Sequence, residues 1–242
     1  MKLDLHIHSE YSFDSVIKVD KIIKVSKKIG LNGIAITDHN TVKGSLEAIK
    51  ANKNHDFIII PASEIGTNLG DIIGYFINEE IKSRDAFEVI DEIKRQGGIA
   101  VLAHPYKRVK TYTAKLMRRI DALEGFNARI ERKTRLRSSW SLAKKYNLPM
   151  TAGSDAHFYF EIGRGISLLK NASDIEEAKK EIRQGEIELL GTLSPSYVEI
   201  FSQIIRMFKS KNPRSLPIGS LLKSTLDRFI AMNGRKSILT TC

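Results

Sequence analysis

The stretch LDLHIHSEYSFDS, residues 3–15, places two histidines one residue apart near the start of the chain. Apolar and polar residues alternate over residues 3–8, and this period of two predicts a β-strand. Alternate side chains of a strand lie on one face, so His6 and His8 would point the same way, about 6.5–7 Å apart along the strand. From there both imidazoles can tilt onto one cation. The pair alone is equally compatible with two histidines on a partly solvent-exposed strand face, so its interpretation depends on the rest of the chain.

The composition is that of a globular protein with a buried core. The chain has 242 residues, of which 42% are hydrophobic and 28% charged, and this length fits a single α/β barrel domain. Cys242 is the only cysteine, which excludes a disulfide within one chain and thiolate metal ligands in the core, and suits a reducing compartment. We find no signal peptide and no stretch of about 18 uncharged apolar residues. These features predict a cytoplasmic protein without a transmembrane segment.

Strand-like and helix-like segments alternate along the chain. Helical periodicity is found at residues 19–29, 41–52, 85–96, 131–146 and 173–184. Short apolar runs between these helices predict strands at residues 33–40, 57–65, 71–77, 98–105, 120–126 and 149–157. Apolar strands alternating with helices are typical of a parallel sheet covered on both faces. With this many repeats, a closed or nearly closed (β/α) barrel is favoured over an open sheet.

The chemically active side chains gather at one kind of position, at or just after the carboxyl end of a predicted strand. They are His6, His8, Asp38, His39, Glu64, His104, Asp155 and His157. Five of the six histidines belong to this set, and only His55, in a polar loop, does not. In an α/β barrel these strand ends share one rim, where active sites are assembled. We therefore interpret the opening pair of histidines as part of a site.

The available ligands are imidazoles and carboxylates without any thiolate. Such a set suits Zn²⁺, Mn²⁺ or Fe²⁺ and is too rich in histidine for a dedicated Ca²⁺ or Mg²⁺ site. The five histidines are joined by four acids, Asp14, Asp38, Glu64 and Asp155. This is more than one tetrahedral ion needs, so we expect two or three divalent ions. Ions about 3.5–4 Å apart activate water and stabilise phosphoryl oxygens, which predicts a hydrolase, with phosphoesters favoured and amide hydrolysis left open.

Motifs in a fixed order resemble a known family. DLHIHSEYSFDS, ITDHNTVKGS, PASEI, LAHP and GSDAH are similar to the motifs of the PHP (polymerase and histidinol phosphatase) superfamily, and ALEGFNAR resembles the strand before its last motif. The resemblance covers residues 3 to about 170. It implies an α/β fold, a distorted (β/α)7 barrel, with a trinuclear metal centre; here a C-terminal helical extension would follow. The implied activity is that of a small stand-alone metal-dependent phosphoesterase.

The resemblance also implies a role for each ligand. The implied metal ligands are His6, His8, Asp14, His39, Glu64, Asp71, His104, Asp155 and His157. The first ion would be held by His6, His8, Glu64 and Asp155, and the third by Asp14, His39 and His157. Glu64 would bridge from the first ion to a second, which His104 also binds. The residues expected to carry catalysis are Glu64, Asp155 and His157.

Two further expectations concern the acids Asp71 and Asp38. Many members of the family have a histidine where this chain has Asp71, at the start of the predicted strand 71–77. As a harder oxygen ligand, Asp71 would shift the preference of the second ion toward Mn²⁺. Asp38 would orient the ligands by hydrogen bonding without binding an ion itself. Capping the helix 41–52 is an equally good interpretation of Asp38.

Positive charge near the predicted site bears on the substrate. The formal net charge is +11, and residues 105–137 carry eleven lysines and arginines against three acids. The mouth of the site is therefore predicted to be electropositive, which attracts phosphates. The candidates for binding a substrate phosphate are Lys107, Arg108, Arg129 and Arg164. Because this charge exceeds what histidinol phosphate needs, nucleotides or oligonucleotide ends are the favoured substrates, with histidinol-phosphate phosphatase as the alternative.

We divide the chain into a barrel at residues 1–194 and a basic, partly amphipathic extension at residues 195–242. Residues 201–242 carry eight lysines and arginines against one acid, and residues 197–208 show the spacing of an amphipathic helix. This extension is expected to pack on the barrel. The alternative is that it contacts nucleic acid, a protein partner or a membrane surface.

A non-catalytic alternative follows from the same resemblance. The protein subunit of archaeal ribonuclease P is a related barrel that binds RNA, and that role needs no metal ligands. This chain carries nearly the full set of ligands, whose buried charges would be costly without a metal. We therefore favour an enzyme over an RNA-binding barrel.

Overall fold

The computed structural model describes residues 1–54, 56–107, 109, 111–130, 133–185 and 187–209. The strands are β1 (Lys2–Ile7), β2 (Gly33–Ile36), β3 (Ile58–Thr67), β4 (Gly70–Tyr75), β5 (Ile99–Leu102), β6 (Ala122–Asn127), β7 (Met150–Gly153), β8 (Gly165–Leu168) and β9 (Glu188–Gly191). The helices are α1 (Val19–Lys28), α2 (Lys43–Ala51), α3 (Ala86–Arg95), α4 (Ala114–Met117), α5 (Lys133–Tyr146), the 3-10 turn η1 (Tyr159–Glu161), α6 (Ile175–Gln184) and α7 (Tyr197–Lys209).

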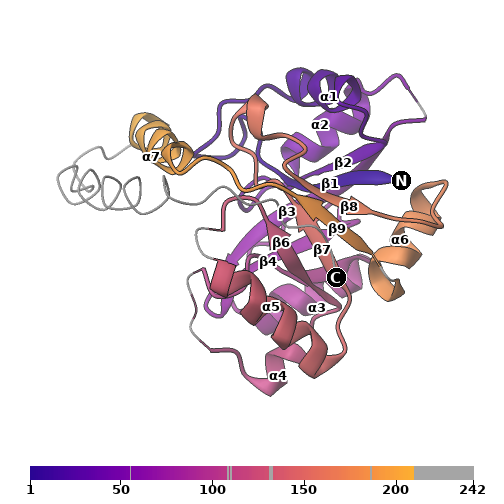
Figure 1. Cartoon of the computed structure of the whole chain (residues 1–242), viewed down its shortest axis with the longest axis vertical. Helices are drawn as coiled ribbons and strands as arrows, with labels where there is room; N and C mark the ends of the chain where they lie inside the picture. The colour runs from indigo at the N-terminus through magenta and orange to yellow at the C-terminus, as the bar shows by residue number, and fades with distance from the viewer. Residues whose placement is uncertain (55, 108, 110, 131–132, 186, 210–242) are drawn as a thin grey trace.

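These strands form one sheet that curls into a nearly closed barrel (Figure 1). Their order is β7-β6-β5-β4-β3-β2-β1-β8-β9. The barrel is bridged just after β7, where Ala156 pairs with Ile7 and its carbonyl oxygen accepts the N–H of His8 at 2.9 Å. Helices α1 and α2 pack on β2, α2 also on β3, α3 on β4 and β5, and α5 on β6. The predicted α/β barrel with a C-terminal helix is confirmed.

The sheet is not parallel throughout. β1–β2–β3 and β5–β6–β7 run parallel, but β4 is antiparallel to both of its neighbours. Only Asn68 and Leu69 join β3 to β4, and so short a connection cannot hold the crossover that a parallel strand needs. The expectation of a parallel sheet is therefore wrong for β4. It is also wrong for β8 and β9, which the sequence did not predict and which extend the sheet antiparallel beyond β1.

The core and the helix ends follow from local sequence. The apolar residues of the strands are buried between sheet and helices, as their continuous apolar runs predict. Asp85 caps α3, because its carboxylate accepts the N–H groups of Phe87 at 2.9 Å and Glu88 at 3.2 Å. Helix α3 therefore begins at Ala86, and its apolar face packs on β4 and β5.

Helix α7 lies to one side of the sheet (Figure 1) and contacts the barrel through Ser202 and through Lys209, its last residue. Nη1 of Arg129 donates to Ser202 Oγ at 2.9 Å, and Nζ of Lys209 donates to the carbonyl oxygen of Ser15 at 2.6 Å. Residues 210–242 of the expected extension lie outside the described residues, and the division at residue 194 stays a prediction. Among the helices described, none is long and apolar enough to cross a membrane.

Candidate metal centre

All nine predicted ligands come together at one rim of the barrel. Their donor atoms form groups within 4.8 Å of one another, namely His8–Asp14–His39–His157, His6–His8–Glu64, His6–His104–Asp155 and Glu64–Asp71–His104. The rim is assembled because parallel strands end on the same side of the sheet. His55, the histidine that the sequence leaves out of the set, lies outside the described residues.

The four ligands predicted for the first ion converge in the interior. Nε2 of His6 lies 3.5 Å from Glu64 Oε2 and 3.6 Å from Asp155 Oδ1. Nε2 of His8 lies 3.4 Å from the same glutamate oxygen and 3.2 Å from the same aspartate oxygen. All four residues are buried. Two nitrogens and two oxygens therefore surround one point.

The second group contains the residue that departs from the family pattern. Nε2 of His104 lies 2.8 Å from Glu64 Oε1 and 3.9 Å from Asp71 Oδ2. Because β4 runs antiparallel, its first residues rather than its last lie at the rim, and this brings Asp71 to the centre. Direct metal binding by Asp71 stays a prediction.

The third group is formed around Asp14, in the loop after β1. Its Oδ2 lies 3.3 Å from His39 Nε2, and its Oδ1 lies 3.3 Å from His157 Nε2. His39 Nδ1 also lies 3.0 Å from Glu64 Oε2, which joins this group to the first. His8 is a member of this group as well, although the resemblance assigned it to the first ion alone.

Hydrogen bonds to Nδ1 set the orientation of three imidazoles. Nδ1 of His6 pairs with Glu124 Oε1 at 2.9 Å, and Nδ1 of His157 pairs with the carbonyl oxygen of Asp155 at 2.8 Å. Since these oxygens only accept, both Nδ1 atoms carry the proton. Nδ1 of His8 lies 3.0 Å from Ser12 Oγ, whose own hydrogen goes to a carboxylate, so it donates as well. Nε2 is thus the atom of each ring that binds a cation once it has lost any proton.

The donor set fits a divalent metal. His6 Nε2 and His8 Nε2 face each other at 3.1 Å, with the carboxylates of Glu64 and Asp155 beside both nitrogens. Oε2 of Glu64 and Oδ1 of Asp14 are buried without a hydrogen-bond partner among the described residues. Buried lone pairs and charges of this kind are costly unless they are paired or bind a metal. An ion in each group would satisfy all of these atoms.

The local electrostatics prepare most of the ligands for binding. Burial, reinforced by the nearby His157 and His39, lowers the pKa of His8 to about 3, so this ring is neutral at pH 7. Burial opposes ionisation of Glu64, yet the surrounding histidines hold its pKa well below the ordinary value. His39 differs: burial is outweighed by Glu64 and Asp14, which raise its pKa to about 10. At His6, too, burial is outweighed, here by Glu124, Asp155 and Glu64, which raise its pKa well above the ordinary value, so a metal ion must displace a proton from each of these two rings.

Asp38 acts on the ligands through two serines. Its carboxylate accepts the N–H of Ser9 at 2.6 Å and the hydroxyl of Ser12 at 3.0 Å, and Ser12 Oγ in turn contacts His8. The residue preceding α2 is Val42, and no side chain caps that helix, so the capping interpretation of Asp38 is wrong. Gly44 is required here, because a Cβ at this position would lie 2.0 Å from Asp38 Oδ2.

The sequence reasoning missed Glu124. This buried acid of β6 accepts from His6 Nδ1 and, through Oε2, from the backbone N–H of His104 at 2.8 Å and Nδ2 of Asn127 at 3.0 Å. Asn127 also donates to Asp155 Oδ2 at 3.2 Å. The signal was present in the motif ALEGFNAR, where one acid stands inside an otherwise apolar strand. Such an acid needs buried partners.

Two ligands are held by unusual backbone conformations. Asp155 has φ of 52° and His104 has φ of 26°, in the left-handed region that non-glycine residues rarely adopt. Residues are kept in such conformations where the surrounding structure requires them, which is common at functional sites. Both turns direct a side chain into the centre just after a strand has ended.

The predicted phosphate-binding cations differ in their surroundings. Nζ of Lys107 lies 3.1 Å from Asp155 Oδ2, and a quarter of its side chain is exposed. Arg129 is buried and paired with Glu161, to which Nε donates at 2.9 Å and Nη2 at 2.5 Å. Arg164 donates to the carbonyl oxygen of Leu193 at 3.1 Å. Arg108 lies outside the described residues. Lys107 is thus the candidate cation seen in contact with the centre.

Comparisons with known proteins identify similar chains. A model of the PHP domain matches residues 4–212. The uncharacterized protein MJ1587 of Methanocaldococcus jannaschii is 44% identical over 120 residues, which cover 45% of this chain and 70% of the relative. The uncharacterized protein MJ0417 of the same organism is 32% identical over 173 residues, which cover 67% of this chain and 68% of the relative.

A solved structure has the same fold. It is that of a two-domain protein of Bacteroides vulgatus described as containing a predicted PHP-like metal-dependent phosphoesterase. It matches with a TM-score of 0.68 at 15% identity, and the match covers 84% of this chain and 69% of that one. At such low identity the likeness shows the fold alone.

Proposed function

Because the chain belongs to the PHP domain family, we propose that it is a metal-dependent phosphoesterase with two or three divalent ions at the rim. The observation that carries the proposal is the convergence of His6 Nε2 and His8 Nε2, 3.1 Å apart in the interior, on the carboxylates of Glu64 and Asp155. A divalent cation bound between them would be held by two nitrogens and two carboxylates at once. Zn²⁺, Mn²⁺ and Fe²⁺ are the ions that suit these nitrogen and oxygen donors.

The ions would be held by the nine ligands described above, and when bound they would supply an activated water and positive charge for phosphoryl oxygens. Glu64 is suited to bridge two of them, because Oε1 faces His104 while Oε2 faces His6 and His8. Asp155 and His157, which follow β7, complete the set at the same rim. We assign the catalytic roles to Glu64, Asp155 and His157 on this basis.

Lys107 is suited to bind the substrate's phosphate. Burial opposes its charge, but Asp155 and Glu199 outweigh it and raise its pKa, so the ammonium group stays charged at all relevant pH values. Its Nζ contacts Asp155, while part of the side chain reaches solvent. A cation in this position can donate to a phosphate oxygen that enters from outside. The contact with Asp155 also orients that carboxylate.

We propose nucleotides or oligonucleotide ends as substrates. The formal net charge of +11 and the cationic segment at residues 105–137 favour a substrate with several phosphates over histidinol phosphate. Histidinol phosphate also carries an ammonium group, which would need a free acid near the mouth. The non-catalytic RNA-binding alternative leaves the buried oxygens of Glu64 and Asp14 without partners, which speaks against it.

The test combines metal analysis with a substrate panel. Purified protein is assayed for bound metals and for hydrolysis of a 5′-phosphorylated oligonucleotide, a nucleoside monophosphate, glycerol phosphate and histidinol phosphate. His6→Ala, His8→Ala and Glu64→Gln should lose metal and activity, whereas His55→Ala, which removes the histidine outside the predicted set, should keep both. Wild-type turnover in His6→Ala or Glu64→Gln would refute the proposal. Preferential hydrolysis of histidinol phosphate would reverse the order of substrates.

A further inference from the structure

Helix α7 leaves an apolar stripe uncovered. Tyr197, Phe201, Ile204 and Phe208 follow one another at helical spacing, and their exposed fractions are 42%, 49%, 39% and 87%. An amphipathic helix normally turns such a stripe toward a core. Here the residues of α7 that are buried are Val198 and Ser202, on the barrel side. The stripe therefore stays exposed to solvent in the part of the chain that the structure describes.

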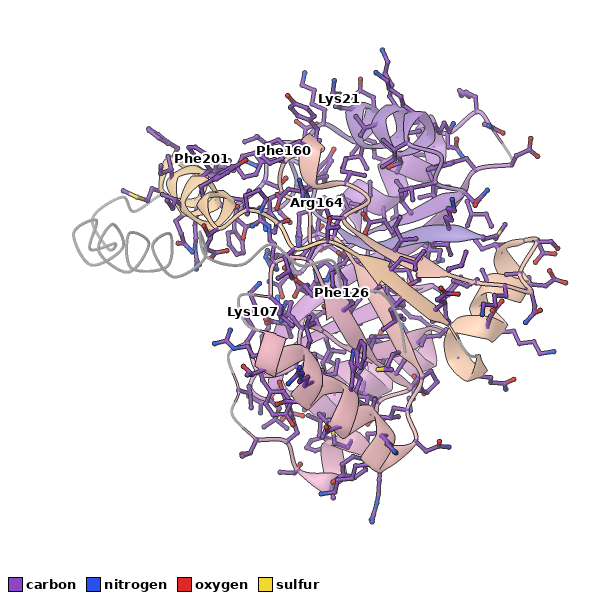
Figure 2. All side chains as sticks on the ribbon, viewed as in Figure 1. Lys21, Lys107, Phe126, Phe160, Arg164 and Phe201 are labelled. Carbon is purple, nitrogen blue, oxygen red and sulfur yellow. The ribbon has the colours of Figure 1, made fainter. Side chains whose placement is uncertain are left out.

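Exposed rings of η1 continue the stripe. Tyr159 and Phe160 are 56% and 41% exposed, and their ring centroids lie 5.8 Å apart. Phe158 joins the two groups, because it stacks on Phe160 at 5.6 Å and meets Phe201 edge to face at 6.1 Å. Figure 2 shows Phe160 and Phe201 on the same side of the molecule, on η1 and α7. We call this surface the aromatic face; its members are Tyr159, Phe160, Tyr197, Phe201, Ile204 and Phe208.

The aromatic face begins at the metal centre. Phe158 directly follows the ligand His157 in the chain, and the guanidinium of Arg129 lies 5.9 Å from its ring centroid. At the other end of α7, Arg206 lies 4.8 Å from the ring centroid of Phe13, which stacks on the ligand His39 at 4.6 Å. A molecule bound along the face would thus have one end at the rim.

Cations, rather than acids, border these rings. Nζ of Lys21 lies 5.2 Å from the ring centroid of Tyr159, and α7 carries Arg206 and Lys209. The single acid of α7, Glu199, faces the cations Lys107 and Arg129. The charge of the face is complementary to a polyanion. A second copy of this chain would bring the same positive charges, and an uncharged apolar peptide would leave them unused.

We propose that the aromatic face binds single-stranded nucleic acid, with bases stacked on Phe160, Phe201 and Tyr197 and phosphates beside the bordering cations. Exposed rings interleaved with cations are the means by which proteins bind single strands without reading their sequence. The strand would lead one phosphorylated end to the metal centre. This inference rests on the proposed function, because the bound strand would be the substrate. Strand binding itself can be measured without any hydrolysis.

The test measures binding of a fluorescein-labelled oligothymidylate of about twelve nucleotides, a length typical of single-strand sites. Phosphorothioate linkages keep the strand intact on the metal-loaded, full-length protein. Phe160→Leu and Phe201→Leu keep apolar volume but lack a flat ring, and each should weaken binding about tenfold. Phe87→Leu, which changes a ring of α3 outside the face, should bind like the wild type. Binding should weaken with salt and be poorer for a duplex of the same length.

Equal affinity of the wild type and Phe201→Leu would overturn the inference, as would the absence of strand binding. The inference would also be overturned if Phe201→Leu abolished dimer formation, or adsorption to anionic lipid vesicles, and left strand binding unchanged. Hydrolysis of the substrate panel described above separates the two proposals. Strand binding through these rings without any hydrolysis upholds the aromatic face and refutes the phosphoesterase, and hydrolysis without strand binding does the reverse.

Discussion

Oε1 of Glu124 lies 2.9 Å from Nδ1 of His6, across 118 positions of the chain. The other oxygen of the same carboxylate accepts the backbone N–H of His104. One buried acid of β6 thus fixes the ring orientation of a ligand on β1 and the turn that carries a ligand after β5. Partners of this kind raise the basicity of an imidazole and hold it toward the metal.

Glu124→Gln should therefore weaken metal binding by about 10- to 100-fold, since loss of such partners typically has this effect. The amide keeps the size of the side chain, but only its carbonyl oxygen accepts, so the bond to His6 or the bond to His104 is lost. Metal titration with a competing chelator measures the change. Glu181→Gln is a matched control, because Glu181 is buried but accepts from Lys170 and Asn171, remote from the ligands. Equal losses of affinity in both variants would show that Glu124 acts only through folding.

Asp71→His restores the residue that many members of the family carry, and it should raise retention of Zn²⁺ relative to Mn²⁺. The physical reason is that imidazole is the softer ligand and that Asp71 Oδ2 lies 3.9 Å from His104 Nε2, within reach of a shared ion. Competition dialysis with equal amounts of the two metals gives the ratio. An unchanged ratio would mean that Asp71 does not contact an ion.

Lys209 should stabilise the third metal group from a distance. Its Nζ donates to the carbonyl oxygens of Glu10 at 2.7 Å, Ser12 at 2.9 Å and Ser15 at 2.6 Å, which hold the loop that carries Asp14. Lys209→Met should weaken the most loosely bound ion about tenfold while the other ions are retained.

The measurement is metal content after graded dialysis, followed with the melting temperature of the same samples. Lys170→Met, which removes an exposed lysine paired with Glu188, is the control and should keep every ion. Lys209→Arg, which can still donate to carbonyl oxygens, should restore part of the affinity. Full metal content in Lys209→Met would refute the role.

Metal binding should release a proton from His39. Its pKa in the metal-free protein is raised from 6.5 to about 10 because Glu64 and Asp14 outweigh the effect of burial. A protonated ring cannot bind an ion, so apparent affinity should rise with pH up to this value, about tenfold per unit for each proton released. The linked stability has the opposite trend: charged His39 stabilises the metal-free fold fully below pH 6.5, and this contribution is lost as the pH rises through about 10.

Calorimetry in two buffers of different ionisation enthalpy counts the released protons. His39→Asn should release fewer than the wild type at pH 7. His8→Asn should bind fewer ions but release as many protons per ion bound as the wild type, because the pKa of His8 is lowered to about 3 and that ring carries no proton to lose. The same count in His39→Asn and the wild type would contradict the assignment.

The sequence by itself predicted strands β1 to β7, helices α1, α2, α3, α5, α6 and α7, and the polar residues that gather at the rim. The alternation around His6 and His8 identifies β1, because side-chain direction in a strand depends only on local backbone geometry. The position of His39, His104 and His157 after predicted strands places them at one rim, because successive parallel strands end on the same side. These inferences need no knowledge of which residues meet across the fold.

Tertiary structure alone decided the partners of those residues. The antiparallel direction of β4 depends on its hairpin with β3, and this brings the start of the strand, Asp71, rather than its end to the rim. Glu124 pairs with His6, and Arg129 with Glu161, across long stretches of chain. No local pattern encodes such contacts, since a buried charge can be satisfied by any complementary group that the fold brings near. The sequence shows that these polar groups must be paired, and the packing of the barrel selects their partners.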